Sequence, residues 1–178
     1  FGEGLNDNQT IAYYLNNCSE SPYNITNYAF NGYGTHQALY NLENNILTQS
    51  NKPKVVIYYF ITDHIFRSAG KALWDSKGPL YEMENNELLY KGGFDENKFI
   101  KPNYITKRLK IIWQNSQLYQ TFFLGKYSEK DIIRVREMIK KMNTLLKKEN
   151  IKFIFLAKKD TDTTIAKNLE ETLFNPLK

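Results

Sequence analysis

The chain has 178 residues, of which 42% are hydrophobic and 24% charged, a balance typical of one folded globular domain and unlike that of a disordered chain. Its apolar runs are only as long as a β-strand, far short of the roughly 20 residues that a transmembrane helix needs. The formal net charge is +5. Much of the excess comes from lysines spaced between apolar residues, which indicates a solvent-facing basic helix surface rather than nucleic-acid binding, for which no motif is present.

The N-terminal part of the chain is predicted to contain a helix followed by a strand. Residues 8–17 are expected to form the helix, with Asp7 or Asn8 as its N-cap. Residues 24–30 are expected to form a short strand. The single Cys18 excludes an internal disulfide. Because neither histidine is near it in sequence, we expect a partly buried, unreactive thiol.

A second helix and a central strand are predicted next. A glycine-containing turn at 31–34 precedes the helix, and Thr35 is its expected N-cap. The segment 54–61 is apolar on both faces, which is typical of a strand covered by helices on each side of a parallel sheet. The apolar stripe of the helix has spacings of three and four and consists of Leu39, Leu42 and Ile46.

A β-hairpin is predicted after the central strand. It spans about 79–94, with two strand-like pieces around Asn85 and Asn86 and glycines on both flanks. An insertion at this point lies near the carboxyl ends of the strands, where open α/β sheets bind ligands. A helix is then predicted over 105–123.

The C-terminal part is predicted to contain a long helix, a strand and a final helix. Ser128 and Asp131 resemble a capping box that starts the long helix. Residues 151–157 are expected to form a buried strand, and 163–173 the final helix. The side chains of the long helix that are expected to face inward are Ile132, Val135, Ile139, Met142 and Leu146.

The alternation of strands and helices predicts an α/β fold. We expect a three-layer α/β/α sandwich with a flavodoxin-like parallel sheet and an inserted β-hairpin, formed as a single domain over residues 1–178. The sequence supplies only about three strands for this sheet, fewer than the usual five or six. We therefore expect strands outside this sequence to complete the sheet.

Several stretches resemble blocks of the SGNH (GDSL-like) hydrolases. Phe1–Asp7 is similar to the phrase that follows the family's nucleophile turn, Gly-Asp-Ser, and residues 27–39 resemble the second block, a strand, a glycine turn and a helix. The third block ends an apolar strand with Asn-Asp. This sequence has Thr62 in place of the asparagine and keeps the aspartate as Asp63. The family's last motif, Asp-x-x-His, has no counterpart in these 178 residues.

The resemblance implies a serine esterase or acylhydrolase that acts on a small acyl ester, such as an acetyl ester, through an acyl-enzyme. Its nucleophile and histidine are then expected outside residues 1–178. Gly32 is the expected backbone donor of the oxyanion hole, and Thr62 the expected replacement for the asparagine donor. The residues expected to border the substrate are Asn31, Tyr33, Asp63 and Arg67.

Some of these residues also have purely structural explanations. Gly32 and Gly34 fit a strand-to-helix turn that requires positive φ, and Tyr33 fits packing over that turn. A triad contained within the chain is disfavoured for both histidines. His36 lies in the first turn of a helix, where the dipole opposes an imidazolium, and His64 directly follows an aspartate in sequence.

The expected partner is a small-molecule or carbohydrate ester, with no nucleic acid, no cofactor and no metal. Asp160 and Asp162 resemble the motif of haloacid-dehalogenase-like phosphatases, but two lysines separate them from the strand, and an N-cap of the last helix explains them better. A bacterial periplasmic or envelope location is favoured, and the oligomeric state stays open. The alternative function is a non-catalytic carbohydrate-binding domain on the same fold, which the loss of the asparagine favours.

Overall fold

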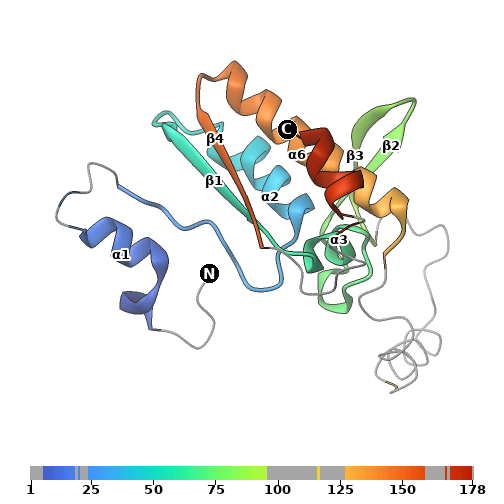
Figure 1. Cartoon of the computed structure of the whole chain (residues 1–178), viewed down its shortest axis with the longest axis horizontal. Helices are drawn as coiled ribbons and strands as arrows, with labels where there is room; N and C mark the ends of the chain where they lie inside the picture. The colour runs from blue at the N-terminus through green and yellow to red at the C-terminus, as the bar shows by residue number, and fades with distance from the viewer. Residues whose placement is uncertain are drawn as a thin grey trace. The chain divides into compact units, whose positions relative to one another are not determined.

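The computed structural model has a mixed α/β architecture with a small parallel sheet (Figure 1). It forms two compact units, Phe1–Tyr33 and Gly34–Lys178, which we describe separately. The helix expected at 105–123 and the aspartates at 160 and 162 lie outside the described residues, apart from Ser116. The described residues are 6–18, 20, 24–95, 116, 127–158, 167 and 169–177.

The N-terminal unit contains the expected helix, but neither predicted N-cap. A short 3-10 turn over Asp7–Gln9 leads into α1, Ile11–Asn17, and Thr10 caps α1 by accepting a 3.2 Å hydrogen bond from the backbone N–H of Tyr13. Thr10 takes this position because the 3-10 turn already includes Asp7. Cys18 is exposed, so the prediction of a partly buried thiol was wrong.

The strand predicted over 24–30 does not form. Asparagine side chains bind the backbone groups that a strand would use for its ladder. Asn16 donates to the carbonyl of Ile25 at 2.8 Å and accepts from its N–H, and Asn27 accepts from the N–H of Ala29 at 3.0 Å. These local bonds compete with sheet pairing.

The second unit contains the parallel strand pair. β1, Val55–Phe60, runs parallel to β4, Lys152–Ala157, in a register that pairs Val55 with Lys152 and Phe60 with Ala157. Both strands and their parallel arrangement in a sheet were predicted, but the direct pairing of one with the other was not. The register brings together two segments separated by about ninety residues of chain.

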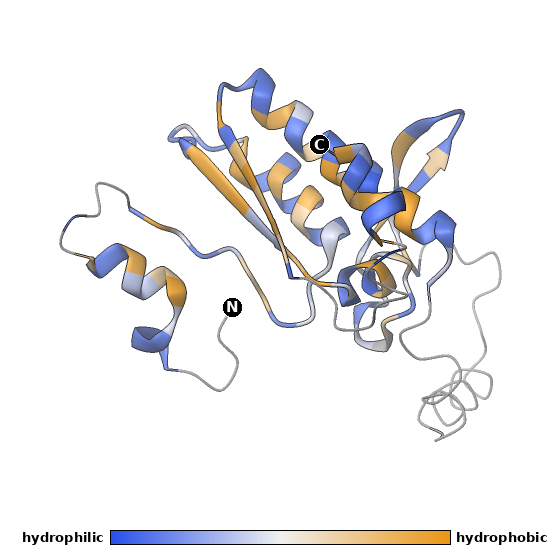
Figure 2. Ribbon diagram, in the orientation of Figure 1, coloured by the Kyte–Doolittle hydropathy of each residue, from blue (hydrophilic) through white to orange (hydrophobic). Residues whose placement is uncertain are grey.

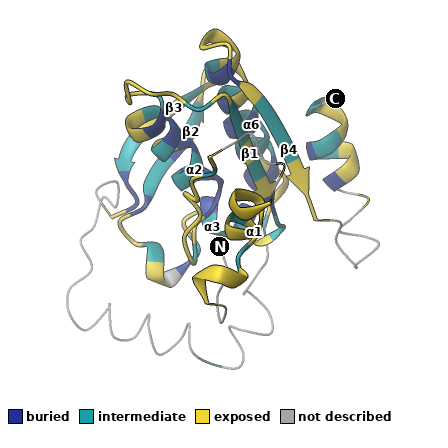
Figure 3. Cartoon of the chain, turned by 90° about the vertical axis from the view of Figure 1, so that its left-hand side faces the viewer, coloured by how far each residue is buried: buried dark blue, intermediate teal, exposed yellow. Residues whose placement is uncertain are grey.

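The two faces of this sheet differ in burial. The face that carries Tyr58 and Phe60 packs on the hydrophobic core. On the opposite face, Ile57, Tyr59 and Leu156 are 55%, 54% and 48% exposed. Figure 3 shows exposed and partly buried stretches on both strands. Within the described part of this unit, helices thus cover one face of the sheet, whereas the sequence predicted cover on both.

The core forms where two helices pack on the buried face of the sheet. α2, Thr35–Asn41, continues as a π-helical turn, Leu42–Ile46, and α6 spans Glu129–Lys148. The apolar stripe of each helix alternates with polar residues (Figure 2). The predicted inward residues are all buried: Leu39, Leu42 and Ile46 from the first helix, and Ile132, Val135, Ile139, Met142 and Leu146 from the second.

The capping box of α6 is present as predicted. Ser128 accepts from the N–H of Asp131, and the Asp131 carboxylate accepts from the N–H of Ser128 at 2.8 Å. The final helix is also observed where it is described: Glu170–Phe174 forms a π-helical turn, followed by the short 3-10 turn Asn175–Leu177. No helix among the described residues is both long and apolar enough to cross a bilayer.

The predicted hairpin is formed by β2, Pro79–Glu84, and β3, Glu87–Gly93, which pair antiparallel. Asn85 and Asn86 join them with φ of 49° and 66°, the positive values that a tight hairpin turn requires. Tyr81 projects from β2 into the core and is fully buried.

Candidate functional site

A short helix at the carboxyl end of β1 brings together three of the predicted site residues. β1 ends at Phe60, and α3 then spans Asp63–Ser68, with Thr62 as its N-cap residue. Asp63 lies in the first turn, where its charge suits the helix dipole, and Arg67 pairs with it one turn later at 3.7 Å. The carboxylate is 68% exposed, whereas the arginine side chain is 17% exposed.

Thr62 has the backbone conformation of a helical residue, with φ −56° and ψ −35°, and its side chain does not cap α3. An N-cap threonine normally has an extended backbone that lets its hydroxyl accept from the helix. The hydroxyl of Thr62 therefore does not accept a capping hydrogen bond from α3, although its position at the helix start would allow one.

The other predicted site residues form a turn in the N-terminal unit. Gly32 has φ 80°, the positive value predicted for it. The N–H of Tyr33 donates to the carbonyl of Phe30 at 3.2 Å, and the two rings pack at 5.4 Å between centroids. Asn31 and Tyr33 are exposed. These contacts account for the turn, and the site roles of Asn31, Gly32 and Tyr33 stay predictions.

Gly34 is needed for a different reason from the one predicted. Its φ of −119° is open to any residue, so the expected requirement for positive φ was wrong. A Cβ atom at this position would lie 2.9 Å from the Cβ of Arg67 and 2.9 Å from the ring of His36. Glycine at this position lets the start of α2 lie directly against α3.

Replacing Gly34 with alanine is expected to lower the free energy of unfolding by about 1–3 kcal/mol, the usual cost of overpacking. Neither the Arg67 Cβ nor the His36 ring is the flexible end of a side chain, so the two helices must move apart. Urea denaturation measures the effect. A variant as stable as the wild type would show that the contact between α2 and α3 is not tight.

Thr35 was predicted to cap α2, but it lies inside the helix and takes part in a partly buried hydrogen-bond chain. The N-cap residue is Gly34. The Thr35 hydroxyl lies 2.8 Å from the Tyr58 hydroxyl, which lies 2.8 Å from Nδ1 of His64. The chain thus joins α2, β1 and α3.

The histidine and the tyrosine of this chain are both neutral. Burial, reinforced by the positive charge of Arg67, lowers the pKa of His64 to about 3. The hydrogen bonds from Nδ1 of the neutral ring to the Tyr58 hydroxyl, and from that hydroxyl to Thr35, can run in either direction according to the ring tautomer. Burial also raises the pKa of Tyr58 above its ordinary value, so its proton stays in place.

A second buried cluster consists of His36, Ser68 and Asp75. Nε2 of His36 lies 2.6 Å from Oδ2 of Asp75, and Nδ1 lies 3.1 Å from the Ser68 hydroxyl. The backbone N–H of His36 also donates to that hydroxyl at 3.3 Å. Burial lowers the pKa of His36, although Asp75 opposes the shift. The neutral ring therefore donates from Nε2 to Asp75 and accepts at Nδ1 from Ser68.

This cluster has the residue types of a Ser-His-Asp triad, but a substrate cannot reach its serine. Ser68 and His36 are both fully buried, so the hydroxyl cannot reach an ester. Ser68 and Asp75 were not predicted from the sequence, in which they lie 32 and 39 residues from His36. No local pattern connects residues so far apart.

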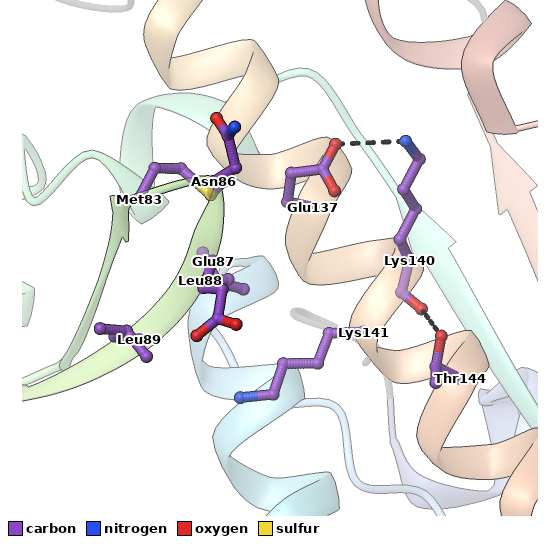
Figure 4. A pocket seen from close by; sticks show the side chains of 9 residues that line it. All are labelled: Met83, Asn86, Glu87, Leu88, Leu89, Glu137, Lys140, Lys141 and Thr144. Atoms are coloured by element: carbon purple, nitrogen blue, oxygen red, sulfur yellow. Dashed lines mark hydrogen bonds and ion pairs between the residues drawn. The ribbon is translucent and has the colours of Figure 1, made fainter.

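A separate groove of about 360 Å³ lies between the hairpin and α6 (Figure 4). Three of its charged side chains form ion pairs: Lys140 bonds Glu137 at 3.2 Å, and Lys141 bonds Glu43 at 2.9 Å. None of the predicted site residues lines this groove. Among the described residues, no three His, Cys, Asp or Glu side chains group in a way that could hold a metal ion.

No protein-family model, curated protein or solved structure matches this chain.

Proposed function

We propose that this chain is part of an SGNH-type serine esterase or acylhydrolase that acts on a small acyl ester. The observation that carries the proposal is the parallel strand β1, which leads at its carboxyl end directly into a helix bearing Asp63 and Arg67, with Thr62 at its start. Open α/β sheets bind ligands at this end of their strands. A three-layer sandwich with a flavodoxin-like sheet is part of the same proposal.

In the proposed reaction, a serine Oγ attacks the ester carbonyl, the alcohol leaves, and water then hydrolyses the acyl-enzyme. The hydroxyl of Thr62 donates to the oxyanion of each tetrahedral intermediate. The sequence resemblance alone assigns Gly32 as a backbone donor. Asp63 and Arg67 shape the end of the strand, and Asn31 and Tyr33 border the substrate.

The serine nucleophile and its histidine base belong to chain outside residues 1–178 in this proposal. The sequence resemblance supports this assignment, because the family's nucleophile motif precedes the phrase that Phe1–Asp7 resembles. Burial supports it too, because Ser68, the serine bonded to a histidine, has no exposed surface.

A fluorophosphonate probe tests the proposal on the whole protein that contains this chain. We expect the probe to label one serine, and peptide mapping to place that serine outside residues 1–178. The 178-residue chain alone is expected to hydrolyse p-nitrophenyl acetate no faster than the buffer does. Labelling of Ser68, or turnover by the chain alone that is lost in His36→Ala, would overturn the assignment.

The second candidate is a non-catalytic carbohydrate-binding domain on the same fold. Thr62 in place of the asparagine donor favours it, and so does an exposed tyrosine pair. Tyr40 on α2 and Tyr90 on β3 are 36% and 49% exposed, with ring centroids 5.5 Å apart. Binding of an oligosaccharide by the whole protein without fluorophosphonate labelling would favour this candidate over the esterase.

A further inference from the structure

The start of α2 and the whole of α3 are fixed to each other by contacts that leave little freedom. Gly34 lies against the Cβ of Arg67. The next two residues, Thr35 and His36, are fully buried, and His36 bonds Ser68, the last residue of α3. A change in the orientation of α3 would therefore move Arg67, which is the neighbour of Ser68.

Asp75, from a third segment of the chain, determines which ring nitrogen of His36 carries the proton. It ends the 3-10 turn Leu73–Asp75, and its side chain is 10% exposed. By accepting from Nε2 of His36, the carboxylate places the ring proton on that nitrogen. Nδ1 is then left as an acceptor, so the Ser68 hydroxyl donates to it and keeps a lone pair for the backbone N–H of His36.

We propose that Asp75, His36 and Ser68 form a positioning relay that fixes α3 against the start of α2 and so holds Arg67 and Asp63 at the end of β1. This inference rests on the proposed function in one respect: the effect of the placement on ester hydrolysis assumes that the protein is an esterase. The residues of the relay act by placing Arg67 and Asp63, because His36 and Ser68 themselves are buried and do not touch substrate.

The proposal depends on an acceptor at residue 75, not on a negative charge there. A catalytic triad would need the charge, because its carboxylate stabilises the imidazolium that forms during the reaction. An asparagine side chain offers an acceptor oxygen without the charge. Asp75→Asn and Asp75→Ala therefore separate positioning from catalysis.

The experiment compares these two variants in the whole protein with a matched control. Tyr81→Phe serves as the control, because it also removes a hydrogen bond of a buried side chain to a carboxylate, that of Tyr81 to Glu43, and lies outside the relay. The readouts are the backbone amide resonances of Gly34 and Arg67 and the kcat/KM for p-nitrophenyl acetate.

We expect Asp75→Ala to shift both resonances and to lower kcat/KM about tenfold or more, since small misplacements at a site can cost up to about 10²-fold. Asp75→Asn should restore both resonances and stay within about threefold of the wild type in kcat/KM. Tyr81→Phe should change neither readout.

Two results would overturn the relay: unchanged Gly34 and Arg67 resonances in Asp75→Ala, or an asparagine variant as impaired as the alanine variant. A wild-type protein that hydrolyses no ester would count against the proposed function instead. In that case the resonances alone test the relay, and their shift in Asp75→Ala with recovery in Asp75→Asn supports it.

Discussion

Acidification from pH 7 to pH 5 is expected to lower the free energy of unfolding by about 2 kcal/mol through His64 alone. In the folded chain the pKa of His64 is about 3, whereas in the unfolded chain it returns to its ordinary value of 6.5. Below pH 6.5 the unfolded state therefore binds a proton that the folded state does not. The loss continues down to about pH 3 and is absent above pH 7.

His36 also lowers the free energy of unfolding as the pH falls. Its pKa is also lowered in the folded chain, so its unfolded form too is protonated first as the pH falls. Asp131 adds to the loss at lower pH, because the pKa of its carboxyl is lowered by hydrogen bonds from Ser128 and Lys71. Urea denaturation at intervals between pH 8 and pH 4.5 measures the combined slope of the two histidines, and the contribution of Asp131 begins below that range.

His64→Asn is the matched variant for this prediction. An asparagine can offer an acceptor oxygen to the Tyr58 hydroxyl near the position of Nδ1, but it does not titrate. In this variant the free energy of unfolding should lose the part of its pH dependence that comes from His64 and keep the part that comes from His36. If the stability of the variant falls with pH as steeply as that of the wild type, His64 is not the neutral group that its burial and the nearby charge of Arg67 indicate.

Thr62→Ala is expected to lower kcat of the whole protein by up to about 10²-fold with little change in KM. The proposed bond from the Thr62 hydroxyl to the oxyanion forms mainly in the transition state, so its loss changes the rate rather than substrate binding. Hydrolysis of p-nitrophenyl acetate at saturating and limiting concentrations separates kcat from KM.

Two further variants sharpen this test. Thr62→Asn restores the side chain of the resembled family and should match or exceed the wild type, because the amide reaches farther than the hydroxyl. Thr48→Ala removes an exposed hydroxyl bonded to the carbonyls of Asn44 and Asn45, and should leave kcat unchanged. An alanine variant of Thr62 with normal kcat and a lowered melting temperature would assign Thr62 a structural role.

Local patterns were sufficient to predict most of the regular elements. The capping box at Ser128 and the apolar spacing that follows it predict α6, because both signals lie within the helix that they specify. The paired asparagines Asn85 and Asn86 predict the hairpin, since their backbone readily adopts positive φ. No strand forms over 24–30, because a strand needs a neighbour to pair with and asparagine side chains bond backbone groups of this segment instead.

The sequence by itself determined most of the helices and strands, although not α3, and which side chains of the long helices turn inward. It also determined that Thr62, Asp63 and Arg67 follow the end of β1. Only the tertiary structure decided which hydrogen-bond partners the first residues of α2 have. Thr35 meets Tyr58 across 23 residues of chain, and His36 meets Ser68 and Asp75 across 32 and 39. Such contacts depend on how whole elements pack, because hydrogen-bond partners separated by several elements leave no periodic signal in sequence.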